Sequence, residues 1–468
     1  MRRWNSPAVE PLEARRLLSV TVAESEPNGF PPDANPVPRV VGESVHFIGA
    51  LDAPGDFDFV RIDLQAGDVF GASMRGAPGL DGMIAFGKTG PDIFNDDSFS
   101  EGGPLPGGSP LPHQADDIRD PEVYCVVSTP GTYFIQLSAF VDPDTGETST
   151  GAYDLEIVVA RPGMESKPVG AKQILFLDFD GGSVEYDLPE GPFVPAFEPF
   201  VNSLSRWGLP AGDLNRLVKE TIKRTTAKLY TFIAANGLNG DYAKSRTPGE
   251  FGLEIRNSFD HPDPGDDPLA SKIVLGRTDS EFFATVWLGS AQHIDVGNFQ
   301  QNDQAAISTN FIEGLLRDFP IAKPGNRSLV VDFVAEYMTW FICHEFAHLV
   351  GVHHTAFTFE NSFNEPANLM DKDIRLPMGA DLVFGTPDDV IAQFGVDEYD
   401  PHERYQGVND TLNTLAFGLS TGTVRRNVQG PGTPPITPAS IALIGDNDGD
   451  DDMNDDDELP ATGRRGSR

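Results

Sequence analysis

Four of the nine histidines in this chain of 468 residues lie close together, between residues 344 and 354. His344 and His348 are four residues apart in a stretch that reads as a helix, so both imidazoles project from the same face. Glu345 adjoins the first of them, where a carboxylate can take a proton from water at a metal. Two imidazoles and a carboxylate at this spacing predict a metal site.

A glycine and a further histidine complete the pattern. Gly351 follows three residues after His348, and glycine readily adopts the left-handed backbone conformation that ends a helix sharply. We expect the chain to turn back here, so that His354 reaches the same metal. His353 could take its place if the turn had another register, and this alternative stays open. Three neutral imidazoles with an open fourth position are what catalytic zinc requires.

The stretch "HEFAHLVGVHH" resembles the metzincin motif H-E-x-x-H-x-x-G-x-x-H. Metzincins also have a Met-turn, and "PANLMDKD" supplies its methionine, Met370, sixteen residues after His354. The resemblance extends loosely over residues 170–425 and implies a zinc peptidase with Glu345 as general base and acid. One departure is Lys372, which stands where astacins and serralysins have a tyrosine, so no tyrosine ligand is carried over and the subfamily stays open.

Helices and strands that could position these groups surround them in the sequence. "RSLVVDFVAEYMTWFICHEFAHLVG" predicts one long zinc-binding helix, with Ser328 as its N-cap and Gly351 as its stop. Residues 212–237 have the apolar spacing of another helix, and "KQILFLDFDGG", "FGLEIRNS" and "SKIVLG" read as strands. The order predicts an α/β (α+β) catalytic domain. Residues 282–299 are the counterpart of the family's substrate-pairing edge strand, and His293 within them is a candidate substrate contact.

The part before this domain, residues 21–160, predicts an all-β sandwich. Short runs of alternating apolar residues are separated there by Gly, Pro and Asp. "ESEPN", "GDFDFVRIDLQAGD", "PGTYFIQL" and "TGAYDLEIVV" resemble the bacterial pre-peptidase C-terminal domain. That resemblance implies a non-catalytic accessory or binding module of an exported protein.

The ends and the linkers complete the predicted domain order. Residues 1–20 contain "VEPLEARRLLS", which resembles the leader of planctomycete surface and exported proteins, so we expect an extracellular or cell-surface protein. Residues 161–170 read as a linker, and 171–429 as the metzincin-like peptidase domain. Residues 430–468 read as a proline-rich linker and a disordered acidic tail; the tail resembles a calcium-binding EF-hand loop but has Asp451 where that loop needs glycine.

The charge of the chain narrows the classes of partner. Lys and Arg number 34 against 71 Asp and Glu, a formal net charge of −37, which argues against nucleic acid and anionic membranes as partners. Clustered carboxylates suit Ca²⁺, which is a candidate structural cofactor beside one catalytic Zn²⁺. No apolar run is long enough to predict a transmembrane helix.

We therefore predict an exported zinc-dependent endopeptidase that acts on protein or peptide substrates. Two alternatives remain: a zinc hydrolase of non-peptide amides, and a surface adhesion or matrix protein whose metal site is structural or inactive. The presence of Glu345 argues against an inactive site, because a site without catalysis tolerates loss of the glutamate.

Overall fold

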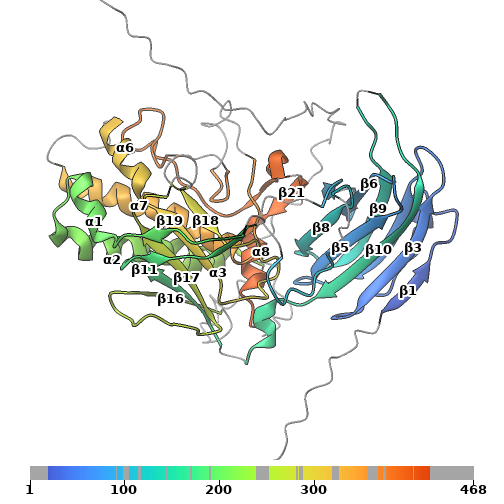
Figure 1. The fold of residues 1–468 in the computed structure, drawn as a ribbon, viewed down its shortest axis with the longest axis horizontal. Coiled ribbons are helices and arrows are strands. Elements are labelled where there is room, and N and C mark those ends of the chain that lie inside the picture. The colour runs from blue at the N-terminus through green and yellow to red at the C-terminus, as the bar shows by residue number, and fades with distance from the viewer. Residues whose placement is uncertain are drawn as a thin grey trace, which may run out of the picture.

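The computed structural model describes residues 19–421, apart from 91, 99–104, 114–117, 144, 169–170, 189–190, 239–251, 281–282, 284–287, 319–325, 357–366, 373–375 and 404. Nearly all of the predicted leader and the whole of the predicted acidic tail lie outside this part. The chain is mostly β-sheet with few helices, and it forms two halves that lie side by side (Figure 1). Among the described residues, no helix has both the length and the apolar character that crossing a membrane needs.

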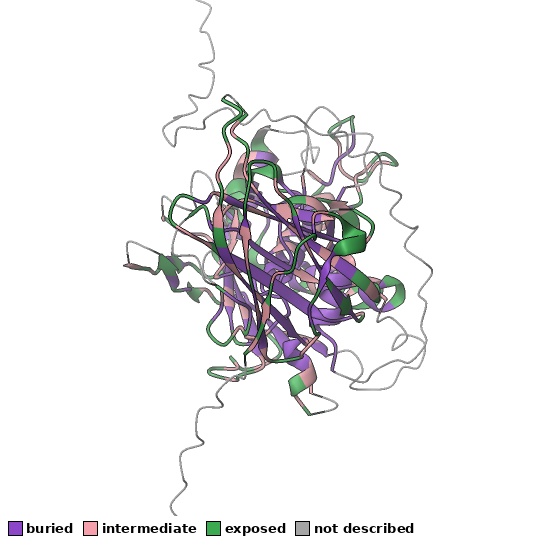
Figure 2. Cartoon of the chain, turned by 90° about the vertical axis from the view of Figure 1, so that its right-hand side faces the viewer, coloured by how far each residue is buried: buried purple, intermediate pink, exposed green. Residues whose placement is uncertain are grey.

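The N-terminal half is a β-sandwich. In β4 the side chains alternate between core and surface, as period-2 patterning predicts, with Val60, Ile62 and Leu64 buried and Arg61 and Asp63 exposed. Buried residues follow the strands, and exposed ones gather in the loops between them (Figure 2). The first sheet has the order β1 (Val20–Ala23), β3 (Ser44–Leu51), β10 (Gly151–Ala160), β5 (Val69–Gly76) and β8 (Glu122–Val126).

The second sheet of the sandwich includes two strands from far along the chain. Its order is β2 (Asn35–Pro36), β4 (Asp58–Leu64), β9 (Gly131–Ala139), β6 (Gly82–Gly87), β7 (Ile93–Asn95), β21 (Gln406–Asp410) and β20 (Val396–Glu398). Strands β20 and β21 belong to the region predicted as the peptidase domain. The predicted peptidase domain therefore contributes two strands to the sheet of the predicted sandwich domain. The domain boundaries at residues 160 and 171 stay a prediction.

The other half contains a mixed five-stranded sheet. Its order is β16 (Leu253–Asn257), β11 (Gln173–Asp178), β17 (Ala270–Gly276), β19 (Gln304–Ser308) and β18 (Gly289–Ala291). The first four strands are parallel, and β18 pairs antiparallel with β19 at the edge. This edge strand lies within the segment predicted to bind substrate.

Helices cover one face of this sheet and hairpins cover the other. Ile273 and Leu275 of β17 face the core shared with the helices, whereas Val274 between them faces the hairpins. The helices are α1 (Val201–Leu204), α2 (Leu214–Thr225), α3 (Ile233–Asn236), α6 (Asn310–Asp318), α7 (Arg327–His348) and α8 (Thr411–Gly418). The hairpins pair β12 (Gly182–Ser183) with β15 (Ala196–Phe197), and β13 (Tyr186–Leu188) with β14 (Gly191–Phe193). Short 3-10 helices are η1 (Pro31–Asp33), η2 (Gly163–Ser166), η3 (Ser205–Trp207), η4 (Ala211–Asp213) and η7 (Pro401–Glu403).

Two details of the helices differ from the sequence prediction. Ser328 is not the N-cap of α7, because Asn326 occupies that position and its side chain accepts a hydrogen bond from the Leu329 amide at 3.3 Å. The helix predicted over 212–237 contains a π-helical turn, η5 (Thr226–Phe232), between α2 and α3. This wider turn places the Lys228 ammonium against the carbonyl oxygen of Ala392, at 2.9 Å.

Candidate metal centre

Helix α7 carries the first two histidines of the motif on one face. His344 and His348 stand one turn apart at its C-terminal end, and their Nε2 atoms are 3.1 Å apart. Both residues pack against the large core between the helix and the sheet, since Cys343, Phe346 and Ala347 around them are fully buried. The helix therefore fixes both rings relative to each other.

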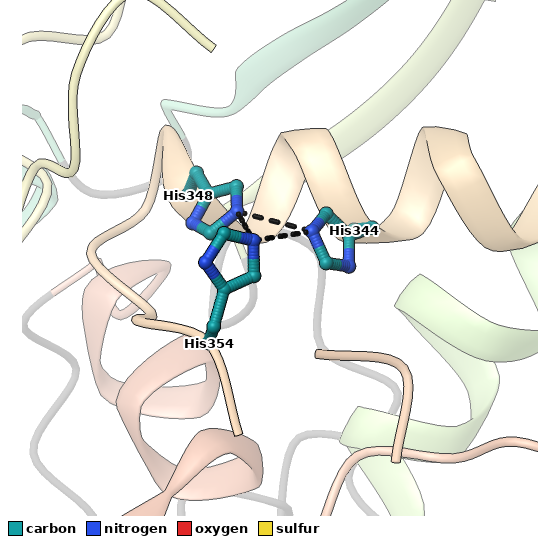
Figure 3. A group of neighbouring side chains, drawn as sticks. All are labelled: His344, His348 and His354. Carbon is teal, nitrogen blue, oxygen red and sulfur yellow. Dashed lines mark hydrogen bonds between the residues drawn. The ribbon is translucent and has the colours of Figure 1, made fainter. Parts of the chain in front are cut away.

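A sharp turn at Gly351 returns the chain to these two rings. Gly351 has a left-handed φ of +102°, and its amide donates to the carbonyl oxygen of His348 at 2.9 Å. A side chain here would also collide with the neighbouring loop, because a Cβ would lie 2.7 Å from the backbone nitrogen of Val296. Glycine is thus required for both conformation and space. After the turn, the Nε2 of His354 lies 3.0 Å from that of His344 and 3.1 Å from that of His348 (Figure 3).

The second nitrogen of each ring identifies the tautomer. His344 Nδ1 is 2.7 Å from the carbonyl oxygen of Leu369, and His348 Nδ1 is 2.7 Å from that of Val352. A carbonyl oxygen only accepts, so both Nδ1 atoms carry the proton and both Nε2 atoms present a lone pair. His354 Nδ1 bonds the Glu403 carboxylate in the same way.

Electrostatics keep the imidazoles of His344 and His348 neutral. Burial and the neighbouring ring of His354 lower the pKa of His344 to about 3. The same two causes, together with His344, hold the pKa of His348 well below its usual value. Neutral imidazoles are the form that binds a metal.

The lone pairs of His344 and His348, which face each other at this distance, repel unless a cation lies between them. Zn–N bonds of 2.0–2.1 Å at tetrahedral angles give N···N separations of about 3.3–3.4 Å. The measured separations of 3.0–3.1 Å are slightly shorter. The donor set of three imidazoles with carbonyl and carboxylate partners on their Nδ1 atoms therefore fits zinc well. His344, His348 and His354 form one of the two groups of possible metal ligands among the described residues.

Glu345 lies beside this centre and is buried, with 4% of its surface exposed. Burial raises the pKa of its carboxyl to about 8. Edge strand β18 passes directly over it, because a Cβ on Gly289 would lie 2.6 Å from Glu345 Cδ. We did not anticipate a role for Gly289 from the sequence, although a glycine inside a strand is a signal of close approach.

The predicted Met-turn contacts one of the three histidines. Met370 is fully buried in the core that contains α7, and residues 368–371 form a turn closed by the Asp371 amide and the Asn368 carbonyl oxygen at 3.3 Å. The turn supplies the Leu369 carbonyl oxygen that orients His344. Lys372, at the position of the missing tyrosine, lies 3.1 Å from a carboxylate oxygen of Asp400.

Two other histidines take different positions. His353 is buried against the rings of Tyr405 and Tyr399, at centroid distances of 4.7 Å and 6.0 Å, and it does not join the trio. His293 is 9% exposed, with its Nε2 3.4 Å from a carboxylate oxygen of Asp303. This burial leaves His293 little surface for substrate, so the structure gives no support to the predicted contact.

Glu403 is the residue of the site that sequence reasoning missed. It is 2% exposed and bonds both Nδ1 and the backbone amide of His354, the latter at 3.2 Å. Burial would raise the pKa of Glu403, but the charge and hydrogen bond of His354 outweigh this and lower it. A carboxylate of this kind fixes the tautomer of a ligand histidine and makes it a stronger donor. No local pattern marks Glu403, since it lies 49 residues beyond His354.

A second group of potential ligands lies in the sandwich. Carboxylate oxygens of Glu24, Glu26 and Asp58 lie within 4.8 Å of one another. Asp58 is fully buried, and burial together with Glu24 raises its pKa to about 7. Asp58 Oδ1 and Asn28 Oδ1 are both buried without a hydrogen-bond partner. Such an all-oxygen set suits a hard cation such as Ca²⁺.

Comparison with known proteins finds partial structural similarities only. No protein-family model and no curated protein matches the chain. The pre-peptidase C-terminal domain of a collagenase from Bacillus anthracis is 14% identical, and the match covers 28% of this chain and 99% of that one with a TM-score of 0.19. PliG, a periplasmic inhibitor of g-type lysozyme, also matches. Its Aeromonas hydrophila form is 14% identical over 30% of this chain and 96% of its own, with a TM-score of 0.17, and its Salmonella Typhimurium form is 12% identical over 27% and 99%, with a TM-score of 0.19. These similarities assign neither a family nor an activity to the chain.

Proposed function

We propose that this protein is an exported zinc-dependent endopeptidase of the metzincin type. The observation that carries the proposal is the convergence of three Nε2 atoms, from His344, His348 and His354, beside the buried carboxyl of Glu345. Zinc held by these imidazoles would supply Lewis acidity, which lowers the pKa of water to about 7 and polarises a carbonyl group.

Glu345 is the proton carrier of this mechanism. Its Oε atoms take a proton from the attacking water and return it to the amine that leaves. Burial raises the pKa of this carboxyl, which favours the second step, the return of the proton to the leaving amine. The enclosed setting also strengthens its electrostatic interactions with the reacting groups.

Edge strand β18 is the proposed binding site for the peptide backbone. The Leu288 carbonyl oxygen accepts from Ser308, and the Gln292 amide donates to Gln304, so these positions face β19. By the alternation of an antiparallel ladder, the N–H and C=O groups of Gly289 and Ala291 point away from β19. A substrate in extended conformation can add to this edge, which passes directly over Glu345.

The remaining parts of the proposal concern location and calcium. Export rests on the resemblance of residues 9–19 to a planctomycete leader and of the sandwich to the pre-peptidase C-terminal domain. Calcium is the proposed second ion, and the carboxylates of Glu24, Glu26 and Asp58 are its proposed ligands, because their oxygens cluster around buried atoms without partners.

The test combines metal analysis with digestion. Purified protein should contain about one tightly bound zinc per chain and cleave members of a peptide library, and a zinc chelator should abolish cleavage. Glu345→Gln should keep the zinc and lose activity, whereas Asp332→Asn, a change of a half-buried carboxylate near the other end of the same helix, should retain both. Full activity in Glu345→Gln would overturn the mechanism. Zinc-loaded wild type that cleaves no peptide but hydrolyses other amides, or nothing, would favour one of the alternative functions.

A further inference from the structure

The segment that holds Glu403 also belongs to the sheet of the sandwich. We call residues 396–403 and 405–410 the bridging segment. Its strand β21 pairs with β20 on one side and with β7 of the sandwich on the other, with Gly407 opposite Ile93. The Val408 amide donates to the carbonyl oxygen of Asp92 at 2.7 Å. Figure 1 shows β21 in orange between the two halves.

Side chains of the bridging segment also enter the core of the sandwich. Tyr399 and Tyr405 are 6% and 1% exposed, and both pack in the cluster that contains Phe86 and Ile93. Their rings lie 5.5 Å apart, and together they cover His353. The sandwich core thus extends to the residue that immediately precedes the third histidine of the trio.

The same segment contacts the chain around His354 through backbone and side chain. The Asp400 amide donates to the His354 carbonyl oxygen at 3.3 Å, and the Ala356 amide donates to that of Glu398 at 2.9 Å. Asn409 Nδ2 donates to the carbonyl oxygen of His353 at 2.9 Å. Glu403 completes these contacts on Nδ1 of His354. His354 has no helix to orient it, so these bonds define where its ring points.

We propose that Glu403 is the positioning residue of the third zinc ligand, and that the sandwich is a required part of the zinc site because it holds Glu403 in place. The inference rests on the proposed zinc site but not on peptide hydrolysis. It changes the expected role of the sandwich, which sequence resemblance describes as an accessory module. Instead, the metal centre in one half depends on the pairing of β21 with β7, a strand of the other half.

Substitution of Glu403 tests the positioning role. Glu403→Gln should weaken zinc binding by about 10- to 100-fold, the usual effect of losing such a carboxylate, measured by competition with a chromophoric chelator. Glu403→Asp should restore part of this loss. The absorption spectrum of the Co²⁺-loaded protein should also change in Glu403→Gln, because the ligand orientation changes. Glu398→Gln, an exposed carboxylate of the same segment, is the matched control and should bind like wild type.

Substitution at the joint tests the role of the sandwich. Gly407 has a left-handed φ of +109°, and a Cβ there would lie 2.8 Å from the backbone carbon of Asp92, so Gly407→Ala should separate β21 from β7. Zinc binding should fall about tenfold or more, the lower end of the loss for Glu403 itself. Gly79→Ala is the control, since Gly79 has a similar φ of +96° but open space around it.

The outcomes separate this inference from the proposed function. Equal zinc affinity and an unchanged cobalt spectrum in Glu403→Gln would overturn the positioning role. If Gly407→Ala binds zinc as tightly as wild type and loses only thermal stability, the role of the sandwich is overturned. If that variant does not fold, Glu403→Gln still decides the positioning role. Wild type that binds zinc and responds as predicted but cleaves no peptide contradicts only the proposed function. Wild type that binds no zinc overturns both.

Discussion

Gly289→Ala tests whether the approach of the edge strand to Glu345 matters for catalysis. An alanine Cβ at this position would lie 2.6 Å from Cδ and 2.9 Å from Cγ of Glu345, whereas ordinary contact begins at 3.4 Å. The carboxylate must therefore move by about 1 Å, and a displacement of about 1 Å in an active site can cost on the order of 100-fold in rate. That factor corresponds to about 2.7 kcal/mol of transition-state stabilisation.

The assay is the steady-state hydrolysis of the best peptide from the library, with zinc content measured on the same sample. Displacement of the carboxylate should lower kcat, whereas a shift of β18 away from the helix should raise KM, so the two parameters distinguish the causes. Zinc content should not change, because the three atoms nearest to the added Cβ all belong to Glu345 and none to a histidine. Gly395→Ala is the matched control, since no atom lies within 4 Å of a Cβ there. A folded, zinc-loaded Gly289→Ala enzyme with wild-type kcat/KM would refute the reasoning.

Three further predictions concern metal binding and stability. His354→Ala should lower zinc affinity by more than about 100-fold, whereas His353→Ala should bind zinc nearly as wild type does; the reverse result in metal analysis would assign the ligand to His353. Asp295 is fully buried, and burial together with Asp303 raises its pKa from 3.8 to about 7, so its contribution to stability is complete below pH 4 and is lost as the pH rises through 7. Asp295→Asn should therefore match wild type in urea unfolding near pH 4 and be more stable by up to about 4 kcal/mol at pH 8; equal stability at both pH values would contradict this. Millimolar Ca²⁺ should raise the unfolding temperature of wild type but not of Asp58→Asn, and a rise in both would place the ion elsewhere.

The trio of histidines could be predicted because its geometry is local. His344 and His348 are one helical turn apart, and Gly351 adopts the conformation that ends the helix. Three residues in a short stretch therefore define most of the site. The structure places all of them, with His354, as this reasoning requires. Local rules are less decisive where two residues suit the same position, as with Ser328 and Asn326 at the start of α7.

Contacts between distant strands could not be predicted in the same way. Alternating apolar residues indicate that a segment is a strand, but not which strand it pairs with. The pairing of Gly407 with Ile93 therefore has no signal in the sequence, and neither does the position of Glu403 that follows from it. The sequence resemblance compares the sandwich with a separate accessory module. It therefore says nothing of the contacts that the sandwich makes with the bridging segment of this chain.

The three histidines differ in which parts of the chain orient them. This explains why His354 needs contacts from both halves of the molecule. His344 and His348 stand on a helix that is packed in the core, and the carbonyl oxygens of Leu369 and Val352 orient their rings. His354 lies on an irregular segment between the Met-turn, where the Thr355 amide donates to the Met370 carbonyl oxygen at 2.8 Å, and the bridging segment. The first contact holds the backbone that follows His354, and Glu403 of the bridging segment holds the ring itself. A chain that began at residue 171 would keep the whole HExxHxxGxxH motif and still lack β7, the strand with which the bridging segment of Glu403 pairs.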